Sequence, residues 1–290
     1  MKSNVKAHLP PRGPGPAPTV SVIVGVKNGA AVLQGCLDSV AAQDWDSRET
    51  IVVDSASTDG TPAMLEANRR AGKITDYVSE PDRGLYEAWN KALRRARGEW
   101  ICFLGCDDRF HDAQALRSLL GAAAGGARVI HGRVNLVTAN GVVGEVLGKP
   151  WREARRAFLA GTMLPHTGML HHRSLFEEHG FFDESYRIAG DYDLLLREVL
   201  TREPVFVDRV TVDMRFGGMS SKPGAILGNL REIQRARMKR GLRGMPARLR
   251  LAIAAAWIGD VIRAVLGDRV YGWCADFYRV ARGKPRIWTA

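Results

Sequence analysis

Short apolar runs alternate with amphipathic stretches over the first third of the chain. Runs rich in β-branched and aromatic residues predict β-strands at residues 20–26, 49–54, 74–79 and 99–105. Between them, apolar residues recur with helical spacing in 31–42 and 84–96, and Pro62 opens a helix after the second strand. Parallel strands need such crossovers, so the pattern predicts an α/β fold: a Rossmann-like, mostly parallel sheet with helices on both faces.

The pattern changes in the second half of the chain. Two apolar runs, 129–138 and 142–148, flank Asn140-Gly141, which is a strong hairpin signal and predicts an extension of the sheet. A strand is then expected at 167–171, followed by helices at 173–179 and 191–200. Further on, Pro246 separates two amphipathic helices, predicted at 226–240 and 247–266.

These boundaries divide the chain into three parts. Residues 1–18 contain the stretch PPRGPGPAP and are expected to form a flexible leader. Residues 19–225 form the main domain, and 226–290 form a helical C-terminal extension. Because the start of the chain has no apolar signal region and no run reaches the roughly 20 apolar residues that span a bilayer, we expect a cytoplasmic protein.

Composition supports a globular protein, and its charge is unevenly placed. The 290 residues are 46% hydrophobic and 25% charged, with a net charge of +11 that suggests a nucleic-acid or anionic-membrane partner. Residues 231–290 hold 14 basic and 4 acidic side chains, so +10 belongs to the extension and +1 to the rest. Nucleic-acid binding is therefore disfavoured, because the body is nearly neutral and the loops after its strands are rich in acids that repel phosphate. The four cysteines form no CxxC pair.

Acidic residues follow the predicted strands, at the sheet edge where open α/β folds bind ligands. Asp54 ends the second strand and is placed to contact a ribose or a base. Asp107 and Asp108 follow the fourth strand, where they either bind a divalent cation such as Mg²⁺ or cap the next helix. Asp191 opens a later helix, as an N-cap or as a catalytic base. His166 is assigned to the pocket, and Arg83 is a candidate phosphate partner or a solvated charge.

Six collinear segments between residues 19 and 221 together resemble a family 2 glycosyltransferase, of the bacterial polysaccharide branch that includes colanic-acid-type enzymes. The segments are VSVIVGVKN, IVVDSASTDGT, EPDRGLYEAWNKAL, FLGCDD, HTGMLHHRSLFEEHGFFDESYRIAGDYDLLLR and FGGMS. The resemblance implies a GT-A fold, a nucleotide-diphospho-sugar donor, a divalent metal (Mn²⁺ or Mg²⁺) and inversion at the anomeric carbon.

The same resemblance implies roles for single residues. Asp191 takes the place of the catalytic base, and Asp108 that of the metal ligand. The implied donor-binding residues are Lys27, Asn28, Asp54, Ser55, Arg83, Asn90 and Asp107. The chain departs from the family pattern where Ser55, Cys106 and Gly190 replace acids that the family often has.

The basic extension points to the location of the protein. Its helices combine arginines with Trp257 and other aromatic residues and are too polar to span a bilayer, which is typical of segments that lie in an anionic membrane interface. Packing on the catalytic domain and a homodimer are the alternatives. We therefore expect a transferase, peripheral on the inner face of the cell membrane, that acts on a glycan or polyprenyl-diphosphate-linked acceptor. A nucleotidyltransferase, a non-catalytic GT-A-like scaffold and a nucleic-acid-binding protein are the competing hypotheses.

Overall fold

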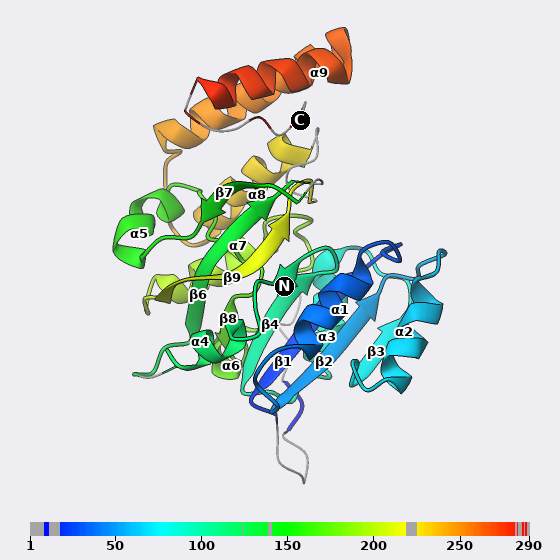
Figure 1. Cartoon of the computed structure of the whole chain (residues 1–290). Coiled ribbons are helices and arrows are strands. Elements are labelled where there is room, and N and C mark those ends of the chain that lie inside the picture. The colour runs from blue at the N-terminus through cyan, green and yellow to red at the C-terminus, as the bar shows by residue number, and fades with distance from the viewer. Residues whose placement is uncertain are drawn as a thin grey trace.

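A mixed nine-stranded sheet runs through the computed structural model of the chain (Figure 1), which describes residues 9–11, 18–123, 125–138, 141–218, 225–281, 283, 286 and 288. The strand order is β3-β2-β1-β4-β8-β6-β9-β5, and β7 pairs with β6 outside this path. The expected α/β architecture with helices on both faces of the sheet is confirmed.

The N-terminal half is the predicted parallel sheet. It contains β1 (Val20–Val26), β2 (Arg48–Asp54), β3 (Asp76–Ser79) and β4 (Trp100–Gly105), joined by α1 (Leu33–Ala41), α2 (Thr61–Arg70) and α3 (Leu85–Leu93). All three pairings in this half are parallel. Val26 pairs with Asp54, and Gly25 pairs with Gly105. The loops after β1, β2 and β4 therefore leave the sheet at one edge.

The other half is mixed in direction. It contains β5 (Arg109–Phe110), α4 (Ala115–Leu120), β6 (Val129–Val137), β7 (Val143–Leu147), α5 (Trp151–Leu159), β8 (Leu170–His172), α6 (Arg173–His179), α7 (Gly190–Val199) and β9 (Val205–Arg215). The predicted hairpin is confirmed as the antiparallel pair β6 and β7, although Asn140 lies outside the described residues. β8 is antiparallel to both β4 and β6, so the sheet is parallel only as far as β4 and from there carries both directions.

Two hydrophobic cores cover the sheet. Along β1 and β4, Ile23 and Phe103 face one core, while Val22, Val24 and Leu104 face the other. Strands buried on both faces consist of nearly continuous apolar residues, which is why the sequence shows runs here and no strict alternation. The first core is shared with α3, α5, α6 and α7, and the second with α1 and α4.

The C-terminal extension divides into two structurally different parts. α8 (Ala225–Lys239) packs on the body, where Ile233 and Ala236 join the first core. α9 (Ala247–Val280) contributes Leu249 to that core and packs Ile253 against it, and near its end Arg279 lies 3.8 Å from Glu145 of β7. Gly267 interrupts α9 with φ 82°, so the two parts of the helix fold back on each other as an α9 hairpin (Figure 1), and the aromatic ring of Tyr271 packs beside Gly259.

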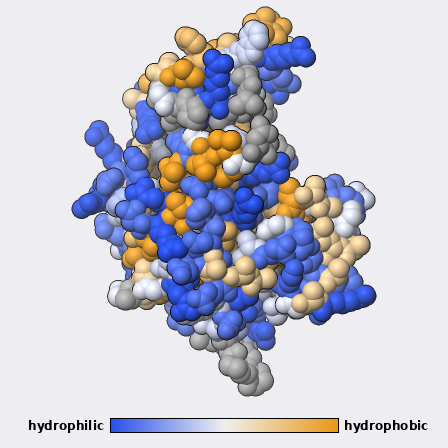
Figure 2. Space-filling model, viewed as in Figure 1, coloured by the Kyte–Doolittle hydropathy of each residue, from blue (hydrophilic) through white to orange (hydrophobic). Residues whose placement is uncertain are grey.

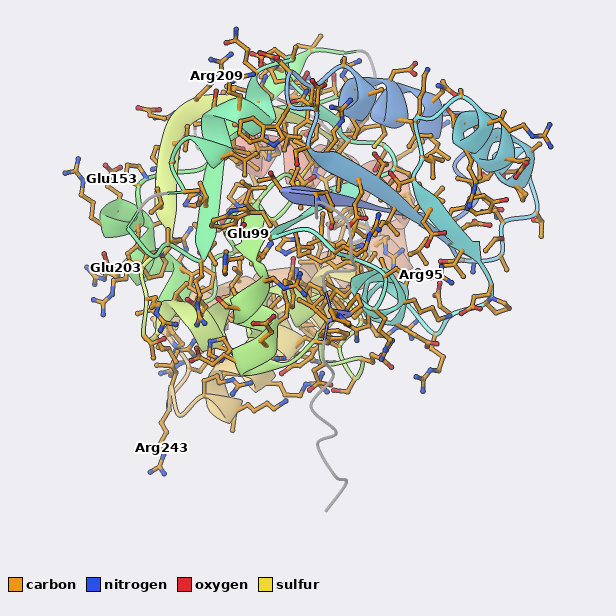
Figure 3. All side chains as sticks on the ribbon, turned by 90° about the horizontal axis from the view of Figure 1, so that it is seen from below. Arg95, Glu99, Glu153, Glu203, Arg209 and Arg243 are labelled. Atoms are coloured by element: carbon orange, nitrogen blue, oxygen red, sulfur yellow. The ribbon has the colours of Figure 1, made fainter. Side chains whose placement is uncertain are left out.

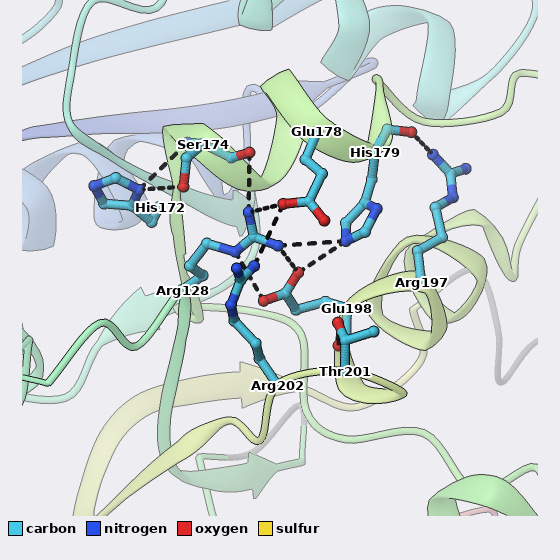
Figure 4. Close-up of polar contacts among 9 residues, drawn as sticks. All are labelled: Arg128, His172, Ser174, Glu178, His179, Arg197, Glu198, Thr201 and Arg202. Atoms are coloured by element: carbon cyan, nitrogen blue, oxygen red, sulfur yellow. Dashed lines mark hydrogen bonds and ion pairs between the residues drawn. The ribbon is translucent and has the colours of Figure 1, made fainter.

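A buried ion-pair network joins β6 to α6 and α7 (Figure 4). The guanidinium of Arg128 contacts the carboxylates of Glu198 and Glu178, and His179 Nε2 lies 2.9 Å from a Glu198 oxygen. Arg128 and Glu198 are both buried, so each needs the other's charge. This network lies at the amino end of β6, since Arg128 directly precedes Val129, and it links α6 and α7 to the sheet.

The leader is tied to the body at one point. Leu9 is buried in the first core, and the Pro10 carbonyl accepts a hydrogen bond from Arg173 Nη2 at 2.9 Å. A fully flexible leader is thus the wrong expectation for residues 9–10, because Leu9 gains burial there. The rest of the predicted leader, residues 1–8 and 12–17, lies outside the described residues, as do residues 219–220 of the FGGMS segment.

Candidate active site

Asp54 organises the loops that follow β1 and β2. Its buried carboxylate accepts hydrogen bonds from the Ser57 backbone N–H at 3.2 Å and from the Ser79 hydroxyl at 2.5 Å. Asn28 has φ 51°, a left-handed conformation that Asn tolerates better than most residues, and its side-chain oxygen accepts a hydrogen bond from the Thr58 backbone at 2.9 Å. The two loops are therefore fixed to each other at the edge predicted to bind the donor.

Asp107 and Asp108 lie together at the end of β4. Asp108 is buried, whereas Asp107 is exposed. An added Cβ on Gly105 would lie 3.0 Å from an oxygen of each carboxylate, so both carboxylates turn back toward the strand end. The Thr167 hydroxyl donates to Asp108 Oδ2 at 2.7 Å, and the Arg215 backbone N–H donates to Oδ1 at 3.1 Å.

Burial and the neighbouring Asp107 charge raise the pKa of Asp108 to about 6, although the Thr167 hydrogen bond opposes this shift. A carboxylate that is desolvated beside a like charge is stabilised by a cation. The pair borders a cavity of about 220 Å³, which Asp213 and Arg215 also line. Among the described residues no three His, Cys, Asp or Glu side chains form a metal-binding group. The pair alone fits a hard divalent ion that takes one or two carboxylates and completes its shell with phosphate oxygens and water.

Asp191 lies in the first turn of α7, which confirms the predicted helix, but the N-cap of that helix is Ala189. Asp191 Oδ1 accepts hydrogen bonds from the Tyr192 backbone N–H at 2.8 Å and from the Tyr86 hydroxyl at 3.2 Å. Burial raises the pKa of Asp191 to about 6, and these two hydrogen bonds act in the opposite direction. A carboxylate with this pKa is mostly ionised at neutral pH and is still able to accept a proton.

Gly190 explains one departure from the family pattern. An added Cβ at Gly190 would lie 2.7 Å from Tyr86 Cε2 and equally close to the rest of that ring edge. The Tyr86 ring therefore occupies the space that an acidic side chain at position 190 would need. Glycine at this position allows the tyrosine hydroxyl to reach Asp191.

Aromatic rings connect the two carboxylate sites. Asp191 contacts Tyr86, whose ring centroid lies 5.7 Å from that of Trp89. Trp89 stacks on His166 at 5.2 Å, and Thr167, next in the chain, binds Asp108. His166 is buried with its Nε2 unpartnered among the described residues, and burial lowers its pKa well below the usual range. His166 thus lies in the wall between the two sites as a neutral side chain.

The remaining predicted residues differ in how free they are to bind a ligand. Lys27 is exposed and Ser55 is half-buried, both on the loops described above. Arg83 is exposed and donates to Glu87 at 2.6 Å and to Glu184 at 2.8 Å. The buried Asn90 amide donates to the Phe182 carbonyl at 2.9 Å and to the same Glu184 at 3.0 Å, so in this structure it holds a loop.

Several residues of the site were absent from the sequence-based prediction. Thr167 and Tyr86 lie inside the recognised segments, but nothing in their spacing shows that they bind Asp108 and Asp191. Glu232 of α8 accepts hydrogen bonds from the backbone N–H groups of residues 187, 188 and 189, each at 2.9 Å. Those residues directly precede α7, so the extension helps to position Asp191.

Comparisons with known proteins bear on the family of the chain. The model of the family "Glycosyl transferase family 2" matches residues 21–179. The chain is 34% identical over 225 residues to an uncharacterized glycosyltransferase of Mycobacterium tuberculosis, covering 75% of this chain and 83% of the relative. It is 30% identical over 217 residues to the PGL/p-HBAD biosynthesis glycosyltransferase of Mycobacterium bovis, covering 71% and 80%.

A solved structure shows the same fold. The mannosyltransferase PcManGT from Pyrobaculum calidifontis, in complex with GDP-Man and Mn²⁺, superposes with a TM-score of 0.61 at 20% identity, covering 92% of this chain and 82% of that one. This likeness confirms the expected GT-A fold.

Proposed function

The chain belongs to glycosyl transferase family 2, and on that premise we propose that it is an inverting enzyme that transfers a sugar from a nucleotide-diphospho-sugar to a hydroxyl of a lipid-linked glycan in cell-surface polysaccharide or glycolipid synthesis. The observation that carries the proposal is the position of Asp191. This carboxylate has a pKa near 6 and lies across one aromatic wall from the Asp107–Asp108 pair. The biosynthetic role of the M. bovis relative supports an acceptor of this class.

The donor side of the site is built from the strand-end loops. Asp54 and Asn28 fix these loops, and Asp107 and Asp108 are the residues that would hold Mn²⁺ or Mg²⁺. When bound, the divalent ion supplies positive charge for the departing nucleoside diphosphate. The Mn²⁺ and GDP-Man named with PcManGT support this assignment.

The acceptor side depends on Asp191. The acceptor oxygen forms a bond to the anomeric carbon while the bond from that carbon to the diphosphate breaks, and the hydroxyl proton passes to the Asp191 carboxylate. A single displacement of this kind inverts the anomeric configuration. Tyr86 and the Tyr192 backbone N–H both bind Oδ1, so we assign proton transfer to Oδ2.

We also propose that the α9 hairpin attaches the enzyme to an anionic membrane surface. None of the described helices combines the length and apolar content needed to cross a bilayer. Large apolar side chains of the hairpin nevertheless lie in solvent: Leu251, Trp257, Val265, Trp273 and Phe277 are 71%, 59%, 74%, 70% and 78% exposed. Figure 2 shows apolar surface beside strongly hydrophilic side chains in this region. Apolar and basic side chains together favour an anionic interface.

Donor binding is tested by thermal shift with UDP-, GDP- and dTDP-sugars, with and without Mn²⁺. We expect one nucleotide class to raise the melting temperature in a metal-dependent way, because a ligand that binds the native state stabilises it. Asp108→Asn should lose this dependence, whereas the same change at the half-buried Asp112, Asp112→Asn, should keep it. In a turnover assay the product should be a free nucleoside diphosphate. Pyrophosphate release would identify a nucleotidyltransferase instead.

Membrane attachment is tested by flotation of the full chain with vesicles. The double variant Trp257→Ser and Trp273→Ser should bind anionic vesicles much more weakly than the wild type. The comparison variant Trp45→Ser changes a half-buried tryptophan outside the extension and should bind normally. Equal flotation of the double variant and the wild type would place the contact elsewhere.

A further inference from the structure

A second depression lies outside the candidate active site, between α5 and the connection from α8 to α9. It has a volume of about 500 Å³ and is lined by three arginines over an apolar floor: Arg152, Arg155, Arg156, Leu159, Ala160 and Pro246. Spacings of three and four residues place the arginines on one face of α5. In Figure 3, Glu153 of the same helix lies at the edge of the molecule and Arg243 of the connection projects into solvent.

The arginines of this depression are poorly neutralised. Arg152 has one acidic neighbour, the adjacent and exposed Glu153, at 3.9 Å. Within the described part of the chain, no carboxylate forms an ion pair with Arg155 or Arg156. Arg128, by contrast, contacts two carboxylates. Three neighbouring guanidinium groups with a single exposed counter-charge favour an anionic ligand, and guanidinium binds phosphate groups in a bidentate manner.

The depression is directly connected to the element that carries the proposed base. The Tyr192 hydroxyl donates to the Phe158 carbonyl at 2.8 Å, and the two rings pack 4.8 Å apart. Leu159, next in the chain, lines the depression, and its carbonyl accepts a hydrogen bond from Arg237 Nε at 2.8 Å. The side chain of Tyr192, the residue after Asp191, therefore reaches from α7 to the floor of the depression.

The depression also borders the proposed membrane contact. Pro246 forms part of its lining and directly precedes α9, whose exposed apolar residues begin at Leu251. A ligand that spans both features has an anionic head and an apolar chain. A long nucleic acid fits less well, because its regularly spaced phosphates need an extended basic groove.

We propose that Arg152, Arg155 and Arg156 bind the diphosphate of a lipid-borne acceptor whose chain lies in the membrane beside the α9 hairpin. The glycan on that diphosphate extends toward Asp191. This assignment rests on the proposed function, which it deepens by naming how the acceptor is recognised.

The test measures binding of the full chain to phosphatidylcholine vesicles that contain geranylgeranyl diphosphate. Vesicles with geranylgeraniol, which lacks the charge, and inorganic pyrophosphate in solution are the comparison probes. The main variant replaces all three depression arginines by glutamine. The matched control removes the same charge from exposed positions of α2 and α4 with Arg69→Gln, Arg70→Gln and Arg117→Gln.

We expect the wild type to bind the diphosphate vesicles more tightly than either comparison probe. The main variant should bind them roughly 100-fold more weakly, at about 1 kcal/mol for each basic residue near an anionic surface. The control should change by less than roughly fivefold, because its three arginines lie outside the depression and each already pairs with a carboxylate. If the triple variant is unstable, the single change Arg156→Glu should still weaken binding.

Three results would overturn the assignment: equal losses in the two triple variants, equal affinity for pyrophosphate and for diphosphate vesicles, or displacement of the vesicles by duplex DNA. Donor-induced thermal shifts are measured on the same samples. Loss of vesicle binding with an unchanged donor shift supports the arginine site. If the wild type shows no donor shift, the proposed function fails, while the vesicle result still reports on the depression.

Discussion

Asp191→Asn should stabilise the protein while strongly lowering its transfer rate. Burial raises the pKa of Asp191 from 3.8 to about 6, so the folded state binds the proton more tightly than the unfolded state. At about 1.4 kcal/mol per pKa unit, the ionised carboxylate costs about 3 kcal/mol of folding free energy at neutral pH. The stability linked to this group is fully present below pH 3.8 and is lost as the pH rises through about 6. Asparagine keeps an oxygen for Tyr86 and the Tyr192 N–H but carries no charge.

The assay is thermal unfolding with a chelator between pH 4 and pH 8, combined with transfer rates at saturating Mn²⁺. At pH 7 the variant should melt roughly 5 °C higher than the wild type, and the difference should vanish near pH 4. Its transfer rate should fall by roughly 10²- to 10⁴-fold, and the wild-type rate should decline below about pH 6, where the base is protonated.

Asp193→Asn is the matched control. Asp193 lies two residues further along α7, is fully buried, and forms an ion pair with Arg197. The same chemical change at this position leaves a buried guanidinium without its partner, so it should lower the melting temperature. An Asp191→Asn variant that is less stable than the wild type at pH 7, or a stability gain that does not depend on pH, would refute the reasoning.

Two further substitutions test how Asp191 is positioned. Gly190→Ala should push the Tyr86 ring away and break its hydrogen bond to Asp191, which should lower kcat roughly tenfold and move the acid limb of the pH–rate profile to higher pH. The control is Gly228→Ala, where an added Cβ meets nothing within 4 Å, and it should leave kcat unchanged. Glu232→Gln places a side-chain amide N–H against the backbone N–H groups before α7, so Asp191 should be less well positioned and kcat should fall while the Kd for the sugar donor stays constant. A parallel loss of affinity for the sugar donor would contradict a positioning role.

The strands and helices of the first half follow from the sequence because local patterns and tertiary burial agree there. β1 has the predicted bounds, and in the second half α6 also matches its predicted range of 173–179. The direction of β8 does not follow from any local pattern: a three-residue strand gives no signal for pairing antiparallel to β4. The same limit applies to Leu9, since a single apolar residue in a Pro/Gly-rich stretch gives no sign that it is buried.

The candidate site was predictable where a residue's chemistry coincides with the end of a strand or the start of a helix. Asp54, Asp108 and Asp191 meet that condition, and the structure places all three at such positions. The residues that contact these carboxylates were not predictable in this way. Thr167 lies 59 residues from Asp108 in the sequence, and Glu232 lies about 40 residues from Asp191. Local spacing carries no information about such pairs, whereas Gly190 offered a signal: a missing acid in the family pattern marks the space taken by Tyr86.

The basic residues of the extension have two different roles, which its amphipathic pattern does not distinguish. Arg237 is buried in α8 and donates to the carbonyls of Leu159 and Gly244, so part of the positive charge serves the fold. The α9 hairpin has a similar pattern, but beyond Ile253, which packs against the first core, most of its large apolar side chains stay in solvent. An apolar stripe predicts that a helix is covered by something, and only the three-dimensional packing shows that the body covers α8. The basic residues that bear on acceptor binding are therefore those of the uncovered α9 hairpin, which borders the depression lined by the three arginines of α5.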